Sequence, residues 1–225
     1  YLCRKQTVLH RLTYLIVYPF IYGVASLPFP LLYMLSDFLC FVMYDIFGYR
    51  KKVVRKNLML VFPEKDNKWY KKIERKFYHH MCDIMLETIK SFKISEEEMK
   101  KRFKIKNIEA LKQFEEKDRS VIVMCGHYAS WEWMMSLGYH LKHKGHGIYT
   151  PLINKHFDRL VKRIRKRHNA YVISRYEALD TIRNHDKNNE RGIYGFASDQ
   201  SPQPKPKSYW RKFLGVKVPV FLGAE

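Results

Sequence analysis

Acidic residues are scarce in this chain of 225 residues. Asp and Glu number 22 against 42 Lys and Arg, so the formal net charge is +20. A surface with this excess of cations favours anionic partners, such as phospholipid head groups, acidic proteins or nucleic acid. The charge alone does not choose among these three.

Cysteine is also sparse. The four cysteines, Cys3, Cys40, Cys82 and Cys125, are scattered without short paired spacings, so the sequence indicates neither a disulfide framework nor a zinc site. Reduced thiols facing a cytosolic compartment fit this pattern best. The chain also lacks a glycine-rich phosphate loop, a Gly-x-Ser-x-Gly motif and an internal repeat. We therefore expect no metal and no cofactor.

Charged side chains are missing altogether from residues 12–36. A straight membrane span needs roughly 20 apolar residues, but Pro and Gly interrupt this segment several times, so two short helices around residues 27–30 fit better than one rod. Basic residues flank both ends, which places both ends in the cytoplasm by the positive-inside rule. The segment predicts a re-entrant or interfacial membrane hairpin. The alternative is a buried helical hairpin of a soluble protein.

The remaining chain divides into two parts. Residues 50–119 are charged, with apolar residues at helical intervals, and should pack as helices against the core. Beyond residue 120 strands alternate with helices, which predicts an α/β fold with a largely parallel sheet flanked by helices. We expect strands at 120–125, 147–150, 170–174 and 192–197, and helices at 130–142, 155–167 and 176–184. The expected organisation is a membrane hairpin at 1–48, a helical connection at 49–118 and an α/β core at 119–225.

The most informative residues are His127 and Glu132, which stand where the first strand meets a helix. Ser130 is a plausible N-cap, so Glu132 would lie in the first helical turn. Within one helix, residues five apart point about 140° away from each other, so the pair works only if His127 stands in the turn. There Glu132 would accept a hydrogen bond from one imidazole nitrogen. The other nitrogen would take a proton from an alcohol.

This spacing resembles the His-x-x-x-x-Asp or Glu signature of the lysophospholipid acyltransferase superfamily, most closely its lipid A biosynthesis branch. Other segments are similar to blocks of that branch, in the same order, over nearly the whole chain: Arg50 to Pro63, Tyr149 to Asn154, the cluster through Arg165 and Arg167, Ser198 to Gln200, and Phe213 to Gly215. The family usually continues for further strands and helices. We therefore expect this chain to be a fragment truncated at its C-terminus.

The resemblance also suggests roles for residues outside the His127 motif. It places a substrate-phosphate arginine at about Arg165. On a helical projection of residues 155–168, Arg165 and Arg167 lie at the borders of the apolar stripe, where they can turn inward. Asn154 and Asp199 are carried over as orienting polar groups near the same cleft. Asp199 and His127 both follow strands of the predicted sheet, at the edge where sites of such folds lie.

The resemblance implies a membrane-associated acyltransferase. His127 would activate a hydroxyl of a phosphorylated glycolipid, a lipid A precursor, for attack on an acyl thioester carried by acyl-carrier protein or by coenzyme A. The enzyme would act at the cytoplasmic face of a Gram-negative inner membrane. We expect no nucleic acid among its partners. One alternative is acyl-CoA-dependent acylation of a lysophospholipid or aminolipid. Another is a basic, non-catalytic module that binds membranes or nucleic acid.

Overall fold

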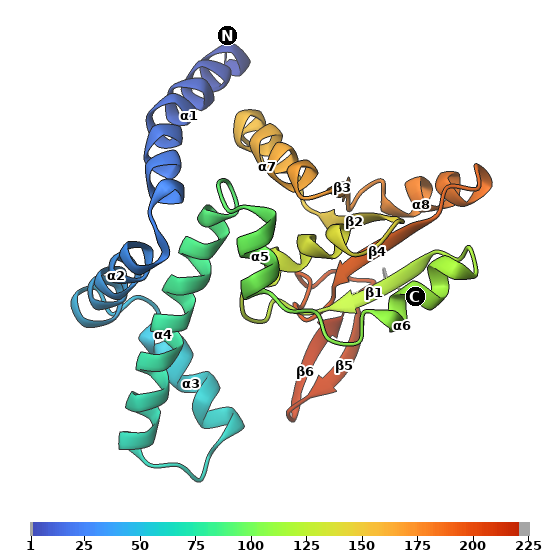
Figure 1. The fold of residues 1–225 in the computed structure, drawn as a ribbon. Coiled ribbons are helices and arrows are strands. Elements are labelled where there is room, and N and C mark those ends of the chain that lie inside the picture. Colours follow the sequence, from blue (N-terminus) through green and yellow to red (C-terminus); the bar gives the residue numbers. More distant parts are fainter. Residues whose placement is uncertain (1, 221–225) are drawn as a thin grey trace.

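The structure, a computed structural model, describes residues 2–220, and two apolar helices form its N-terminal part (Figure 1). They are α1 (Leu2–Ser26) and α2 (Phe29–Cys40), and α2 continues into a π-helical turn, η1 (Phe41–Ile46). Pro28 and Pro30 stand at the start of α2, where a missing backbone N–H costs nothing. The windows 8–26 and 29–46 are each long and apolar enough to cross a membrane. The predicted pair of apolar helices is thus confirmed.

A layer of further helices connects this hairpin to the sheet, with α4 (Asn67–Lys90) at its centre. Leu32 of α2 and Leu86 of α4 lie in one buried cluster that also includes Trp133. Ser36 of α2 donates a hydrogen bond of 2.6 Å to Asp83 of α4. The hairpin therefore shares its core with the rest of the chain. The other helices of this layer and of the connection to the sheet are α3 (Lys51–Val61), α5 (Glu96–Arg102) and α6 (Glu109–Glu116).

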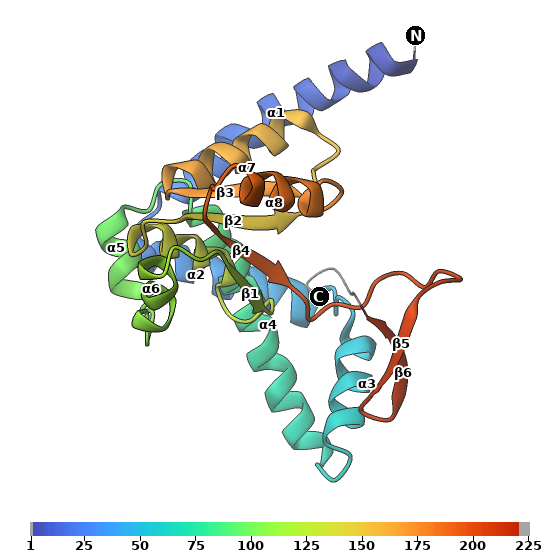
Figure 2. The same ribbon diagram turned by 90° about the vertical axis from the view of Figure 1, so that its right-hand side faces the viewer.

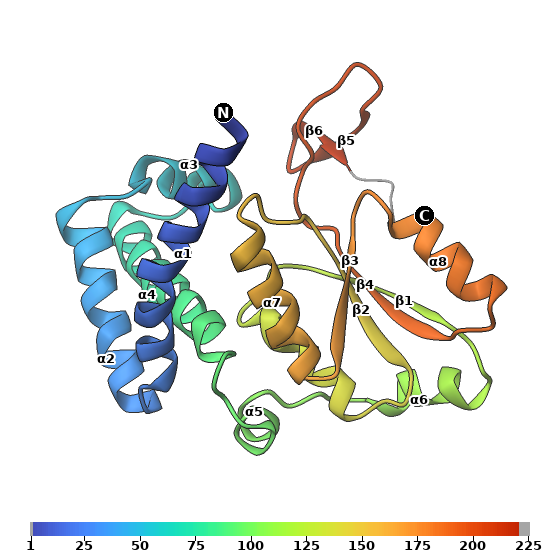
Figure 3. The same ribbon diagram turned by 90° about the horizontal axis from the view of Figure 1, so that it is seen from above.

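The second half of the chain contains the predicted parallel sheet. Its strands are β1 (Val121–Cys125), β2 (Lys144–Tyr149), β3 (Ala170–Ser174) and β4 (Gly192–Ala197), in the order β1-β4-β2-β3. All three pairings are parallel. The helix α7 (Lys155–Arg167) connects β2 to β3, and α8 (Ala178–Lys187) connects β3 to β4. Figure 3 shows the sheet and these two helices beside the helices α1 to α4. The predicted fold class is confirmed.

Two local predictions differ from the structure in kind, and two others differ in their bounds, since β2 begins at Lys144 and α8 extends to Lys187. The segment expected as a helix at 130–142 is a 3₁₀ helix, η2 (Trp131–Tyr139), and Ser130 makes no capping hydrogen bond. Residues 209–220, for which no strand was predicted, form an antiparallel hairpin. It consists of β5 (Tyr209–Phe213) and β6 (Val216–Val220). Its turn residues, Leu214 and Gly215, both have positive φ, 48° and 76°, as a tight hairpin turn of this kind requires.

Gly138 of η2 gives a test of how the 3₁₀ helix packs. A Cβ atom at this position would lie 2.6 Å from the backbone oxygen of Asn169 and 2.9 Å from that of His168. Because backbone cannot swing aside as a side chain does, we expect Gly138→Ala to destabilise the protein by about 1–3 kcal/mol. Gly145→Ala in β2 is the control, since nothing lies within 4 Å of its Cβ position. Thermal unfolding of both variants measures the difference, and equal melting temperatures would contradict this packing.

Candidate active site

The parallel pairing of β1 with β4 brings His127 and Asp199 together. Cys125 pairs with Ala197 at the carboxyl ends of the two strands, and the Ser198 N–H continues the pairing by donating to the Cys125 carbonyl at 2.9 Å. Both strands end at the same edge of the sheet. His127 and Asp199 follow two residues after Cys125 and Ala197, respectively. The sequence predicted that both residues follow strands, and the structure adds that these strands are neighbours.

Asp199 holds His127 through two hydrogen bonds. Asp199 Oδ1 lies 2.7 Å from the imidazole Nδ1, and Oδ2 accepts the His127 backbone N–H at 2.8 Å. Because the His127 backbone N–H holds the Asp199 carboxylate in place, the carboxylate also sets the orientation of the His127 ring. Gly126 permits this approach, since a Cβ there would lie 3.2 Å from Asp199 Oδ2.

The electrostatics of the pair favour an ionised Asp199. Its partial burial by itself raises the pKa of the carboxyl, but the hydrogen bonds from the His127 ring and backbone lower it by more, so the pKa lies below its usual range. An ionised carboxylate must accept the Nδ1 proton, which leaves Nε2 unprotonated in the neutral ring. No hydrogen bond within residues 2–220 occupies Nε2. The imidazole is therefore arranged as a proton acceptor.

Glu132 does not occupy the position that the sequence-based interpretation gave it. Its carboxylate accepts two hydrogen bonds from Arg165, at 2.6 Å from Nη2 and 3.3 Å from Nε, and both side chains are largely buried. The imidazole nitrogen expected to contact Glu132 contacts Asp199 instead. Spacing along the chain could not distinguish the two carboxylates, because Asp199 lies 72 residues away and reaches His127 only through sheet pairing.

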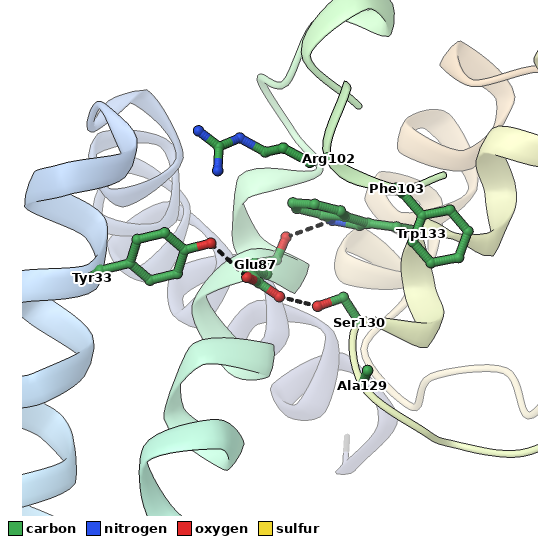
Figure 4. Close-up of a pocket in the computed structure, with 7 residues that line it drawn as sticks. All are labelled: Tyr33, Glu87, Arg102, Phe103, Ala129, Ser130 and Trp133. Atoms are coloured by element: carbon green, nitrogen blue, oxygen red, sulfur yellow. Dashed lines mark hydrogen bonds between the residues drawn. The ribbon is translucent and has the colours of Figure 1, made fainter. Parts of the chain in front are cut away.

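The short loop between His127 and η2 is held in an uncommon conformation. Ala129 has a φ of 49°, a region that residues other than glycine seldom adopt. The Trp131 and His127 rings pack in a T-shaped arrangement, with 4.7 Å between the ring centroids. The Ser130 hydroxyl hydrogen-bonds to Glu87 of α4 instead of capping η2. Figure 4 shows Glu87 between Ser130 and Tyr33 of α2, whose hydroxyl donates to the same carboxylate at 2.7 Å.

A cavity of about 420 Å³ lies beside this loop. Seven residues from α2, α4, the segment around α5, the loop after His127 and η2 line it: Tyr33, Glu87, Arg102, Phe103, Ala129, Ser130 and Trp133 (Figure 4). Burial raises the pKa of Glu87, and the hydrogen bond from Tyr33 only partly offsets this. Glu87 could not be singled out from the sequence, because its neighbours in α4, from Ile84 to Ile89, form no recognisable motif around it.

This raised pKa has a consequence for stability. Because the pKa is higher in the folded state than in the unfolded state, the contribution of Glu87 to stability is present at low pH and is lost as the pH rises through the folded-state pKa. Glu87→Gln removes this titration. We expect the difference in melting temperature, Glu87→Gln minus the unsubstituted protein, to increase as the pH rises from about 4 to about 7. The exposed Glu97→Gln on α5 should show no such trend, and parallel curves for Glu87→Gln and the unsubstituted protein would contradict the expectation.

The side chains of Asn154 and Arg167 make hydrogen bonds within the protein. Asn154 is the N-cap of α7: its side-chain oxygen accepts the His156 N–H, and its amide donates to the His10 carbonyl, both at 3.0 Å. Arg167 donates to the carbonyls of Phe92 and Ile94 after α4. Asp199 is in the site, but as the partner of His127. Of the four side chains expected to bind substrate, Asp199 and Arg165 are thus the two that the structure connects to the His127 motif.

Cys125 stands at the end of β1, two residues before His127. Burial, together with the negative charge of Asp199, raises the pKa of its thiol. A raised pKa keeps the thiol protonated near neutral pH, and a protonated thiol is a poor nucleophile. Cys125 is therefore not an activated nucleophile, and the His127 imidazole is the group at this edge of the sheet that is placed to accept a proton.

A comparison with known protein families identifies the family of this chain. Residues 3–219 match the sequence model of a family described as bacterial lipid A biosynthesis acyltransferase. A search of curated proteins found no matching relative. The family match covers nearly the whole chain, from the apolar hairpin through the sheet to β6. This protein is therefore a member of the bacterial lipid A biosynthesis acyltransferase family.

Proposed function

We propose that this protein transfers a fatty acyl chain from a thioester to a hydroxyl group of a phosphorylated glycolipid, with His127 as the general base. The observation that carries the proposal is the contact of His127 Nδ1 with Asp199, which leaves Nε2 to accept a proton. The family match supports acyl transfer as the reaction class. The exposed position of the imidazole, whose side chain is 29% accessible, leaves room for an acceptor.

The reaction follows from these contacts. Nε2 takes the proton of the acceptor hydroxyl as its oxygen attacks the thioester carbonyl carbon, so that the imidazole becomes cationic and the carbonyl oxygen anionic. Asp199 stabilises the imidazolium through Nδ1. When the tetrahedral intermediate collapses, the C–S bond breaks and the imidazolium returns the proton to the thiolate. An ester and a free thiol are the products, and no covalent acyl-enzyme forms.

Glu132 and Arg165 act in this proposal through the loop and not through the imidazole. Their ion pair connects the first turn of η2 to the last turn of α7, so it fixes the helix that begins next to the catalytic loop. The same pair uses two nitrogen atoms of the Arg165 guanidinium. Contact of Arg165 with a substrate phosphate would therefore be made by its remaining nitrogen, or after the pair opens.

The chemical class of donor and acceptor rests on charge and on the family. Acyl-carrier proteins are acidic, so they suit a surface with a net charge of +20. A phosphorylated glycolipid is also anionic. Two apolar helices at the N-terminus would hold the enzyme where such a lipid is found. We place the site at the cytoplasmic face of the inner membrane of a Gram-negative bacterium, where acyl thioesters are available.

A direct assay tests this function. The full chain in detergent micelles should convert a lipid A precursor and acyl-carrier protein thioester to a product heavier by one acyl chain, as seen by mass spectrometry. Arms with acyl-CoA as donor, and with a lysophospholipid as acceptor, distinguish the alternative acylation reaction. Acylation of the lysophospholipid alone would contradict the proposed acceptor. No acyl product in any arm from a folded protein would refute the acyltransferase function.

A further inference from the structure

The β5–β6 hairpin exposes an unusual amount of apolar surface at its end. Phe213 is 66% exposed, Leu214 50% and Val216 46%. Phe213 and Val216 face each other across the hairpin and Leu214 forms the turn between them. We call these three residues the hairpin tip. An exposed cluster of large apolar side chains on a soluble surface marks a contact with another molecule or with a membrane.

Cations surround the hairpin tip without acidic partners. Lys212 and Lys217 are directly opposite each other in the strand register, an arrangement of like charges that weakens a hairpin. The sequence from 200 to 224 contains five lysines and arginines and no Asp or Glu. Within residues 2–220, no ion pair involves Lys212 or Lys217. An anionic partner would offset the repulsion between these two lysines.

The aromatic residues of the hairpin pack under its cations. The Arg211 guanidinium lies 4.6 Å from the centre of the Tyr209 ring, and Lys217 Nζ lies 5.5 Å from that of Trp210. Both rings are partly exposed, 40% for Tyr209 and 38% for Trp210. Tyr and Trp beside Lys and Arg, behind an apolar end, are typical of segments that sit at a membrane interface.

The hairpin lies on the same side of the molecule as α3 and as the carboxyl ends of β1 and β4 (Figure 2). α3 has a similar character, because it exposes Met59 and Leu60 together with Lys52 and Lys56. It follows directly after the second apolar helix. Two separate elements with exposed apolar and basic residues therefore lie on the side of the molecule at which β1 and β4 end (Figure 2).

We propose that the β5–β6 hairpin is a second membrane contact, which inserts the hairpin tip into an anionic lipid surface while Lys212 and Lys217 bind lipid phosphates. A lipid surface satisfies both halves of the hairpin at once, since its interior accepts the apolar tip and its head groups neutralise the lysines. An acidic protein would neutralise the lysines, but it would not explain why the hairpin tip exposes large apolar side chains. The contact would hold the edge of the sheet at which β1 and β4 end, with His127, against the membrane.

Photochemical cross-linking of the full chain tests this contact without depending on catalysis. A benzophenone amino acid, p-benzoylphenylalanine, replaces Phe213 in one protein and the exposed Gln113 of α6 in the control protein, since α6 lies at the other end of the sheet (Figure 2). Each protein is irradiated in vesicles that contain phosphatidylglycerol and in vesicles of phosphatidylcholine alone. We expect lipid adducts from position 213 in the anionic vesicles, fewer in the neutral vesicles, and few from position 113.

A charge variant separates loss of the contact from loss of the fold. Lys212→Gln combined with Lys217→Gln removes like-charge repulsion, so it should stabilise the hairpin while lowering the adduct yield at position 213 by up to about 30-fold. Leu214→Asn should also lower the yield, because it removes an apolar side chain from the hairpin tip. Asparagine suits the positive φ of this turn position, so the turn itself should be kept. The proposal is overturned if position 213 gives no more lipid adducts than position 113, if it labels only protein, or if the charge variant labels lipid as before. Because the readout is a lipid adduct, these outcomes leave the acyltransfer assay unaffected.

Discussion

His127→Ala should lower the rate of acyl transfer by about 10²–10⁴-fold, the usual contribution of a positioned general base. The reason is that the alanine variant has no group at the carboxyl end of β1 to take the proton of the acceptor hydroxyl. The imidazole makes no contact that the core depends on, since its partners are Asp199, the amide of Gln200 at 3.4 Å and the Trp131 ring. The melting temperature of the variant should therefore change little.

The measurement is single-turnover acyl transfer beside thermal unfolding. His140→Ala provides the matched control, because this histidine is exposed at the end of η2, outside the site. It should keep full activity. A folded His127→Ala protein with the activity of the unsubstituted chain would refute the proposed base. A loss of activity that follows the loss of folded protein would instead indicate a structural role.

The fold was predictable because its signals are local. Uncharged residues interrupted by Pro28 and Pro30 predict two apolar helices, and β-branched runs that end in glycine or a polar turn predict parallel strands. Strand order is not local, and the sequence could not place β1 beside β4. The β5–β6 hairpin was missed because its turn is Leu214-Gly215, without the Asn or Asp that usually marks such a turn.

The site was predictable only in part, for the same reason. His127 follows a strand and so could be placed at the sheet edge from the sequence. Its partner could not, because Glu132 is five residues away and Asp199 reaches the ring from a different strand. The 3₁₀ geometry of η2 and the positive φ of Ala129 set the direction of Glu132 toward Arg165. Neither feature has a clear sequence signal, since alanine seldom adopts positive φ.

Asp199→Asn should therefore reduce acyl transfer nearly as much as loss of His127 itself, by about 10²–10⁴-fold. The carboxylate accepts from both the backbone N–H and the ring of His127, but an amide has only one acceptor oxygen. If that oxygen keeps the backbone N–H, the amide NH₂ faces Nδ1 and favours the tautomer with a proton on Nε2. An imidazole protonated at Nε2 cannot act as the base, and the charge that stabilises imidazolium is gone.

Glu132→Gln provides the comparison that separates the two carboxylates. Glutamine can still accept one hydrogen bond from Arg165, so its effect on the rate should be clearly smaller than that of Asp199→Asn. The effect of Glu132→Gln on the rate should disappear when Arg165→Lys is already present, because lysine cannot make the bidentate pair with Glu132. Adding Asp199→Asn to His127→Ala should cost little more than His127→Ala alone, because residues that act as one unit are not additive. If Glu132→Gln abolishes transfer while Asp199→Asn remains active and folded, Glu132 is the partner of His127 during the reaction, and the contact with Asp199 describes a resting arrangement.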